Sequence, residues 1–143
     1  MSGVTLANPK IQAFLDTKYV VVLATVNPDG SPLAMAMWFL HDPETLAMIS
    51  VDNLGKVRNL RRDPRVCVVA ETGTIGDDQI KGVAVRGRAE FLTDSPARQR
   101  LIERILKKYD PQLEKYWNGR AMPPNRVMFR IVPEHVRSWG LGA

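Results

Sequence analysis

The fold of this chain is decided by residues 19–40, which read YVVVLATVNPDGSPLAMAMWFL. Residues 19–26 are almost wholly apolar and rich in valine, which predicts a strand buried on both faces. Residues 27–30, Asn-Pro-Asp-Gly, predict a tight turn, because proline presets φ and glycine accepts a positive φ. Residues 32–40 form a second strand at hairpin distance, so this stretch predicts an antiparallel pair.

Working outward, we find further short apolar segments between turn residues. Strands are predicted at 46–51, which would continue an antiparallel meander, and at 65–71, 80–92 and 127–132, with 136–139 as a continuation or a seventh strand. Segment 80–92 alternates, so one of its faces is solvated or lies at an interface. Short helices are predicted after Asn8-Pro9, over 55–62, after Ser95-Pro96 and from Pro111 to Trp117. The pattern predicts a mainly β (α+β) fold, a small closed barrel of six or seven antiparallel strands with a few short helices.

Length and composition narrow the class of protein. The 143 residues, 45% hydrophobic and 24% charged, fit a single domain over 1–143. One cysteine and two histidines exclude a disulfide framework and argue against a metal site. No apolar run suits a membrane span, and residues 1–9 lack the pattern of a secretory leader, so we expect a cytoplasmic protein.

The residue types used in acid–base and nucleophilic catalysis form no convincing set. Cys67 lies among valines, which predicts a buried, inert thiol. His41 and His135 fit surface or capping positions, and no phosphate-binding glycine motif follows a strand. We therefore predict no catalytic side chain. If the protein is an enzyme, a bound cofactor supplies the chemistry.

The net charge of +5 is concentrated in one segment. Residues 54–65 hold five basic residues against one acidic residue, Asp63. Such a cluster suits nucleic acid, a phosphorylated cofactor or plain solvation. A Lys56 in the first turn of helix 55–62 would sit beside free N–H groups that suit a phosphate. Nucleic acid is disfavoured, because no aromatic residues are interleaved with these charges.

Residues 34–39, AMAMWF, alternate small with bulky polarizable side chains. A flat ring could lie against such a strand, with backbone groups contacting its edge. Packing in the protein core would explain the same pattern.

These segments together resemble the split β-barrel flavin and deazaflavin oxidoreductase superfamily, the pyridoxamine 5′-phosphate oxidase-like proteins. The resemblance covers nearly the whole chain and rests on residues 21–25 with 29–32, 37–39, 56–66, 82–89 and 136–140. The segment KVRNLRRDPRV at 56–66 is the most specific, and it is most similar to the branch that uses coenzyme F420, a deazaflavin.

The resemblance implies an FMN-binding type of split barrel and a homodimer with cofactor sites at the subunit interface. It implies that Lys56 binds the cofactor phosphate and that Asn59 and Arg62 contact the phosphate or the oligoglutamate tail. The other implied cofactor-binding residues are Met35, Ala36, Met37 and Trp38 at the ring, Ser50 and Val51 at the ribityl chain, and Trp139 closing the pocket. Family members often carry a basic residue shortly before the lysine, where this chain has Asn53, Leu54 and Gly55. Vitamin B6 oxidation is disfavoured, since no residue matches the substrate-binding set of the pyridoxamine phosphate oxidases.

The resemblance also implies an activity. We expect an F420-dependent oxidoreductase that transfers a hydride between the deazaflavin and an unsaturated or conjugated small molecule. An FMN-dependent reductase or oxidase of the same fold is an alternative. A non-catalytic carrier of a flavin, a deazaflavin or haem is another.

Overall fold

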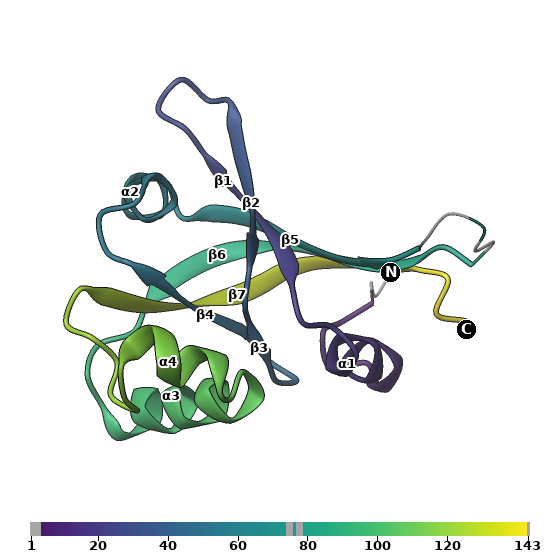
Figure 1. Cartoon of the computed structure of the whole chain (residues 1–143). Coiled ribbons are helices and arrows are strands. Elements are labelled where there is room, and N and C mark those ends of the chain that lie inside the picture. Colours follow the sequence, from purple (N-terminus) through teal and green to yellow (C-terminus); the bar gives the residue numbers. More distant parts are fainter. Residues whose placement is uncertain (1–3, 74–75, 77–78, 143) are drawn as a thin grey trace.

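The computed structural model describes residues 4–73, 76 and 79–142 (Figure 1). Its elements run in the order α1 (Pro9–Asp16), β1 (Val21–Val26), β2 (Pro32–Met37), β3 (Leu40–His41), β4 (Leu46–Val51), α2 (Gly55–Arg62), β5 (Arg65–Thr72), β6 (Lys81–Phe91), α3 (Pro96–Lys108), α4 (Gln112–Trp117) and β7 (Arg126–Trp139). None of the helices in these ranges is long and apolar enough to span a membrane.

The seven strands form one curled sheet in the order β2-β1-β5-β6-β7-β4-β3. Every pairing in it is antiparallel. The two edge strands, β2 and β3, are joined by only residues 38 and 39, so the sheet bends round toward itself as a half-barrel (Figure 1). The predicted mainly β fold with a split antiparallel barrel is confirmed, but the barrel is not closed, because the edge strands β2 and β3 do not pair with each other.

The predicted strand 32–40 is wrong as a single strand. Residues 32–37 pair with β1, whereas Leu40 and His41 pair with β4 at the other edge of the sheet. Between them, the backbone of Phe39 bonds to the side chains of Lys108, the last residue of α3, and of Tyr109, which follows it. Its N–H donates to the Tyr109 hydroxyl over 2.9 Å, and its carbonyl accepts from Lys108 Nζ over 2.9 Å. The hairpin of β1 and β2 is confirmed, but β4 does not extend it into a meander.

Burial on both faces was predicted for the first strand and is found in β4 instead. In β1, Val21 and Leu23 point into the barrel, while Val22 is 43% exposed on the outer face. In β4, Leu46, Ala47 and Met48 are all buried. The reason is that α3 and α4 cover the outer face of β4 and β7, whereas none of the described helices covers the outer face of β1 (Figure 1).

Two apolar clusters follow from this arrangement. One fills the barrel and includes Leu23, Met48 and Phe129, together with Ile11, Phe14 and Leu15 of α1. The other lies between the sheet and α3 and α4 and includes Tyr109, Ile105 and Trp117. The helix starts agree with the sequence: the side chains of Asn8 and Ser95 cap α1 and α3, each followed by proline.

The long strand β7 contains both predicted segments, 127–132 and 136–139, so the second continues the first. Its pairing with β6 shifts between Arg86 and Gly87, which face His135 and Pro133. Glu134 is therefore an extra residue on β7, as in a β-bulge. A Cβ added at Gly87 would lie 2.1 Å from the Val132 carbonyl oxygen, so only glycine fits at this bulge.

Candidate functional site

A pocket of about 360 Å³ opens between the end of β2, strand β4, the start of α2 and the helices α3 and α4. Six residues expected at a cofactor line it: Ala36, Met37, Trp38, Ser50, Val51 and Lys56. The remaining lining residues are Ile49, Leu54, Ile105, Leu113, Tyr116, Trp117 and Arg126. Most of these side chains are apolar or aromatic, which suits a flat organic ligand.

Lys56 supplies one of the two cations of this pocket. It lies in the first turn of α2, as predicted, and is half-buried. Burial lowers the pKa of its ammonium group. Among the residues that the structure describes, Lys56 has no hydrogen-bond or ion-pair partner for this group. A half-buried cation without a counter-charge favours an anionic ligand.

Arg126 supplies the second cation, and the sequence analysis did not identify it. It begins β7 and lies opposite Val51 in the sheet. Its guanidinium donates to the side-chain oxygen of Asn125 over 2.6 Å, and no described carboxylate lies within ion-pair distance of it. Seventy residues separate Lys56 from Arg126 in the sequence, so only the pairing of β4 with β7 shows that they share a pocket.

Trp38 forms a rigid aromatic wall of the pocket. Its ring stacks on Tyr109, with centroids 4.4 Å apart and planes 8° apart. Tyr109 is itself fully buried, and its hydroxyl lies 2.8 Å from the Tyr19 carbonyl oxygen, to which it donates. Burial raises the pKa of Tyr109 to about 12, so the hydroxyl keeps its proton. The indole of Trp38 is thus fixed from behind.

The short helix α4 supplies another wall that the sequence analysis missed. Leu113 and Trp117 are buried under it, while Tyr116 is 73% exposed and lies 6.0 Å from the Trp38 ring between centroids. The sequence reasoning predicted this helix without assigning it to the site. Nothing local in the sequence shows that it faces β4.

Four expected cofactor residues lie outside the pocket lining. Met35 packs against the barrel interior. Asn59 is 3% exposed, and its amide donates to Thr25 Oγ1 and Asn27 Oδ1 over 3.0 and 2.9 Å. The guanidinium of Arg62 donates to the Val26 carbonyl. Asn59 and Arg62 therefore hold the hairpin of β1 and β2 onto α2.

Trp139, the fourth of these residues, lies at the far end of β7 from Arg126. It pairs with Gly82 of β6, and a Cβ on Gly82 would lie 2.2 Å from its indole ring. The ring thus occupies the space that the missing side chain leaves, with 38% of Trp139 exposed. Within one chain, Trp139 does not reach the pocket of Lys56.

The other singled-out residues have structural surroundings. Cys67 is half-buried on the outer face of the sheet, and burial raises the pKa of its thiol, which favours the unreactive protonated form. The His135 ring lies near Arg86 in two shallow surface hollows. His41 was expected at the surface, but its side chain is only 11% exposed and bonds to α1.

A family model for pyridoxamine 5′-phosphate oxidase matches residues 7–140, nearly the whole chain. The chain belongs to the pyridoxamine 5′-phosphate oxidase family. The resemblance seen in the sequence is thereby confirmed at the level of the family and its fold. No curated protein gives a significant match.

Solved structures agree with this membership of the pyridoxamine 5′-phosphate oxidase family. The conserved hypothetical protein Rv2991 from Mycobacterium tuberculosis is 30% identical, with a TM-score of 0.77 over 99% of this chain and 89% of that one. HutZ, the haem storage protein from Vibrio cholerae, is 20% identical, with a TM-score of 0.75 over 94% of each chain. An F420 reductase is 24% identical, with a TM-score of 0.65 over 88% of this chain and 94% of that one. The last two likenesses concern the fold alone.

Proposed function

We propose that the protein is an oxidoreductase that binds coenzyme F420 in the pocket of Lys56 and reduces an unsaturated or conjugated small molecule. The observation that carries the proposal is the unpartnered Lys56 ammonium group at one end of an apolar pocket walled by Trp38. A tricyclic ring with a phosphate-bearing side chain has the same division into an apolar and an anionic part.

The side chains present fit such a cofactor at both ends. Lys56 and Arg126 would hold the phosphate or another anionic group, because each is half-buried without a carboxylate partner in the described part of the chain. Met37 and Trp38 would support the ring, while Ser50 and Val51 would border the linking chain. When bound in its reduced form, F420 would supply a hydride to the substrate, and it reacts poorly with oxygen.

The protein's own part in the reaction is positioning. The stack of Trp38 on Tyr109 holds one wall in place, so a ring lying against it keeps a fixed orientation. Leu113, Trp117 and Ile105 exclude water from the inner end of the pocket. None of the described lining residues is a strong acid, so the proton that accompanies reduction would come from solvent.

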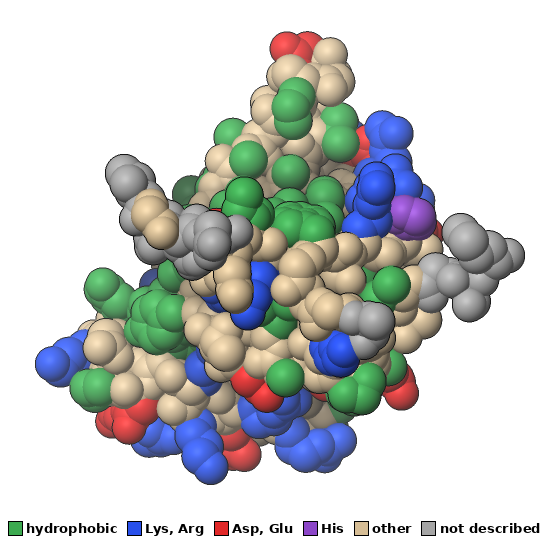
Figure 2. Space-filling model, turned by 90° about the vertical axis from the view of Figure 1, so that its right-hand side faces the viewer, with side chains coloured by type: hydrophobic (Ala, Val, Ile, Leu, Met, Phe, Trp, Pro, Cys, Tyr) green, Lys and Arg blue, Asp and Glu red, His purple; other side chains and the backbone are tan. Residues whose placement is uncertain are grey.

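A homodimer is part of the proposal. Tyr19 and Val20, just before β1, and Val22 on its outer face are 47%, 42% and 43% exposed, and a second copy would cover these apolar side chains. Figure 2 shows hydrophobic side chains gathered on one face of the molecule beneath the projecting hairpin of β1 and β2. Since Trp139 cannot reach its own chain's pocket, it would close the pocket of the partner.

The decisive experiment is a titration of the purified protein with F420 and with FMN, followed by the fluorescence of the pocket tryptophans. Lys56→Gln should weaken cofactor binding by about 1.5–3 kcal/mol, or roughly 10- to 150-fold, if its ammonium group binds the phosphate. Lys115→Gln, an exposed lysine of α4 that does not line the pocket, is the matched control.

Each outcome has a definite meaning. F420 binding, followed by reduction of a member of a panel of quinones, enones and tetrapyrroles, supports the proposal. Binding of FMN alone favours an FMN-dependent reductase or oxidase. Binding without turnover of any panel member favours a carrier, and absence of binding to either cofactor overturns the proposal.

A further inference from the structure

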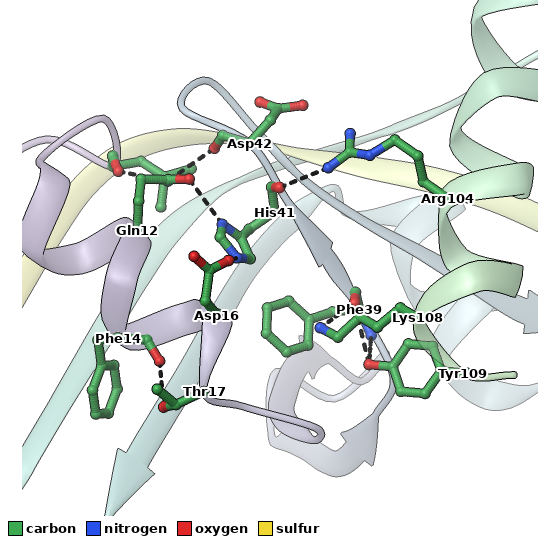
Figure 3. A network of polar contacts seen from close by, with 11 residues as sticks. Gln12, Phe14, Asp16, Thr17, Phe39, His41, Asp42, Arg104, Lys108 and Tyr109 are labelled. Atoms are coloured by element: carbon green, nitrogen blue, oxygen red, sulfur yellow. Dashed lines mark hydrogen bonds and ion pairs between the residues drawn. The ribbon is translucent and has the colours of Figure 1, made fainter.

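A second cavity, of about 520 Å³, lies between α1, β3 and the C-terminal half of α3 (Figure 3). It is lined by Asp16, Leu40, His41, Arg104, Lys107 and Lys108. It shares no lining residue with the pocket of Lys56. Leu40 is its one apolar lining residue, and the other five carry polar or charged groups.

The three basic side chains that α3 contributes to this cavity form no ion pair with a described acidic residue. Arg104 donates to the His41 carbonyl over 3.2 Å, and Lys108 donates to the Phe39 carbonyl over 2.9 Å. No carboxylate in residues 4–73, 76 and 79–142 forms an ion pair with Arg104, Lys107 or Lys108. Neutral carbonyl oxygens satisfy some of their donors, and the charge of Asp16 acts on Lys108 through space, raising its pKa against the larger effect of burial.

The acidic residue of the cavity, Asp16, is bound to His41. The carboxylate of Asp16 lies 2.7 Å from His41 Nε2, and the side-chain oxygen of Gln12 lies 2.8 Å from Nδ1 (Figure 3). The orientation of the Gln12 amide is fixed, because its nitrogen donates to the carbonyls of Leu6 and Asp42. Both ring nitrogens of His41 therefore face acceptors, and only the imidazolium satisfies both.

The charge of the cavity is positive in either state of His41. A charged His41 neutralises Asp16 and leaves three cations, whereas a neutral His41 leaves three cations against one carboxylate. The charged groups that face the ring are Asp16 of α1 and Arg104 and Lys108 of α3, and burial lowers the pKa of His41. A dianion matches this excess of two to three positive charges.

The structure assigns a second anion site to this cavity, formed by Arg104, Lys107 and Lys108, for the phosphate group of a small molecule or for free phosphate. Lys107 and Lys108 also offset the negative end of the α3 dipole. That role does not account for Arg104, which lies one turn earlier and turns its guanidinium toward the cavity. Figure 2 shows Lys and Arg side chains, with some Asp and Glu side chains between them, along the lower side of the molecule, where Figure 1 places α1, α3 and α4.

Lys108 provides a reporter inside the site. Its ammonium group lies 3.7 Å from the centroid of the Phe39 ring, and burial lowers its pKa to about 8. A bound dianion would stabilise the charged form, so the pKa of Lys108 should rise when the site fills.

The test is an NMR titration of the full chain with sulfate, which stays a dianion across the pH range, and then with inorganic phosphate and methyl phosphate. We expect saturable shifts at Arg104 and His41, stronger binding at pH 5.5 than at pH 7.5, and a raised pKa of Lys108. Arg104→Gln and Lys107→Gln should each weaken binding roughly tenfold, since each removes one charge-assisted contact.

Arg100→Gln is the matched control, because Arg100 lies on the same helix but not in the cavity. It should leave binding unchanged, as should Lys56→Gln, which tests the first pocket separately. An unchanged far-UV circular dichroism spectrum would show that the variants fold. Arg104→Lys, which keeps the positive charge, should bind more tightly than Arg104→Gln. An absence of saturable shifts, or equal losses in Arg104→Gln and Arg100→Gln, overturns the assignment. Binding of inorganic phosphate without binding of methyl phosphate would show that the site binds free phosphate rather than the phosphate group of a small molecule.

Discussion

Replacing Tyr109 by phenylalanine removes one oxygen atom from the wall behind Trp38. The ring and its stack on the indole stay in place, but three backbone contacts are affected. The Phe39 N–H loses an acceptor at 2.9 Å, and the carbonyls of Tyr19 and Phe39 lose a donor at 2.8 and 3.2 Å. The Phe39 carbonyl keeps Lys108 as a donor, so it remains satisfied.

The cost of the change follows from these contacts. A buried N–H left without an acceptor costs about 1–3 kcal/mol, and the partly buried Tyr19 carbonyl adds up to roughly 1 kcal/mol. We therefore expect Tyr109→Phe to lower the free energy of unfolding by about 2–3 kcal/mol. For a chain of this size, that loss corresponds to a fall in Tm of roughly 6–9 °C.

Urea unfolding followed by tryptophan fluorescence measures this difference. Tyr116→Phe is the control, because its hydroxyl belongs to a residue that is 73% exposed. It should change the free energy of unfolding by less than about 0.5 kcal/mol. A Tyr109→Phe variant as stable as this control would refute the reasoning, since Phe39 could not then depend on the Tyr109 oxygen.

Two further predictions concern the outer face of β1 and the titration of Lys108. Val22→Glu should convert the proposed dimer to a folded monomer. Light scattering would then give half the mass, while circular dichroism stays unchanged. A wild-type protein that is itself a monomer would refute the proposed dimer. Because the pKa of Lys108 is lowered from 10.5 to about 8, the unfolded chain binds more protons than the folded chain between these values. This lysine should therefore make the free energy of unfolding rise between pH 8 and pH 10. Chemical denaturation in buffers without multivalent anions measures this rise, and Lys108→Met should remove it. An equal dependence of the free energy of unfolding on pH in the two proteins would contradict the prediction.

Local chemistry explains the features that could be predicted from the sequence. The turn at 27–30, the proline-started helices and the alternation in β6 each depend on a few neighbouring residues. Lys56 could be placed in the first turn of α2 because Asp63-Pro64 ends that helix and its apolar residues show the buried face.

The features that could not be predicted depend on contacts between distant segments. Residues 38 and 39 look like part of a strand, but Lys108 and Tyr109, at the C-terminal end of α3, bind the backbone of Phe39 in place of a strand. Arg126 joins Lys56 only through sheet pairing, and no periodicity shows which strand a helix covers. The prediction that β1 is buried on both faces is wrong for its outer face, because composition does not distinguish a barrel interior from an uncovered outer surface.

The bulge at Glu134 constrains how the length of β7 can vary. Before it, Phe129 and Ile131 point into the barrel, whereas after it Val136 does so, which means that inward positions change from odd to even numbers. Loss of Glu134 alone would remove the bulge and restore regular alternation, so Val136 would stay inward and Arg137 outward. Loss of two residues there would reverse the far half of the strand and turn the Arg137 guanidinium toward the apolar interior. Relatives that lack the bulge should therefore have this strand shorter by one residue.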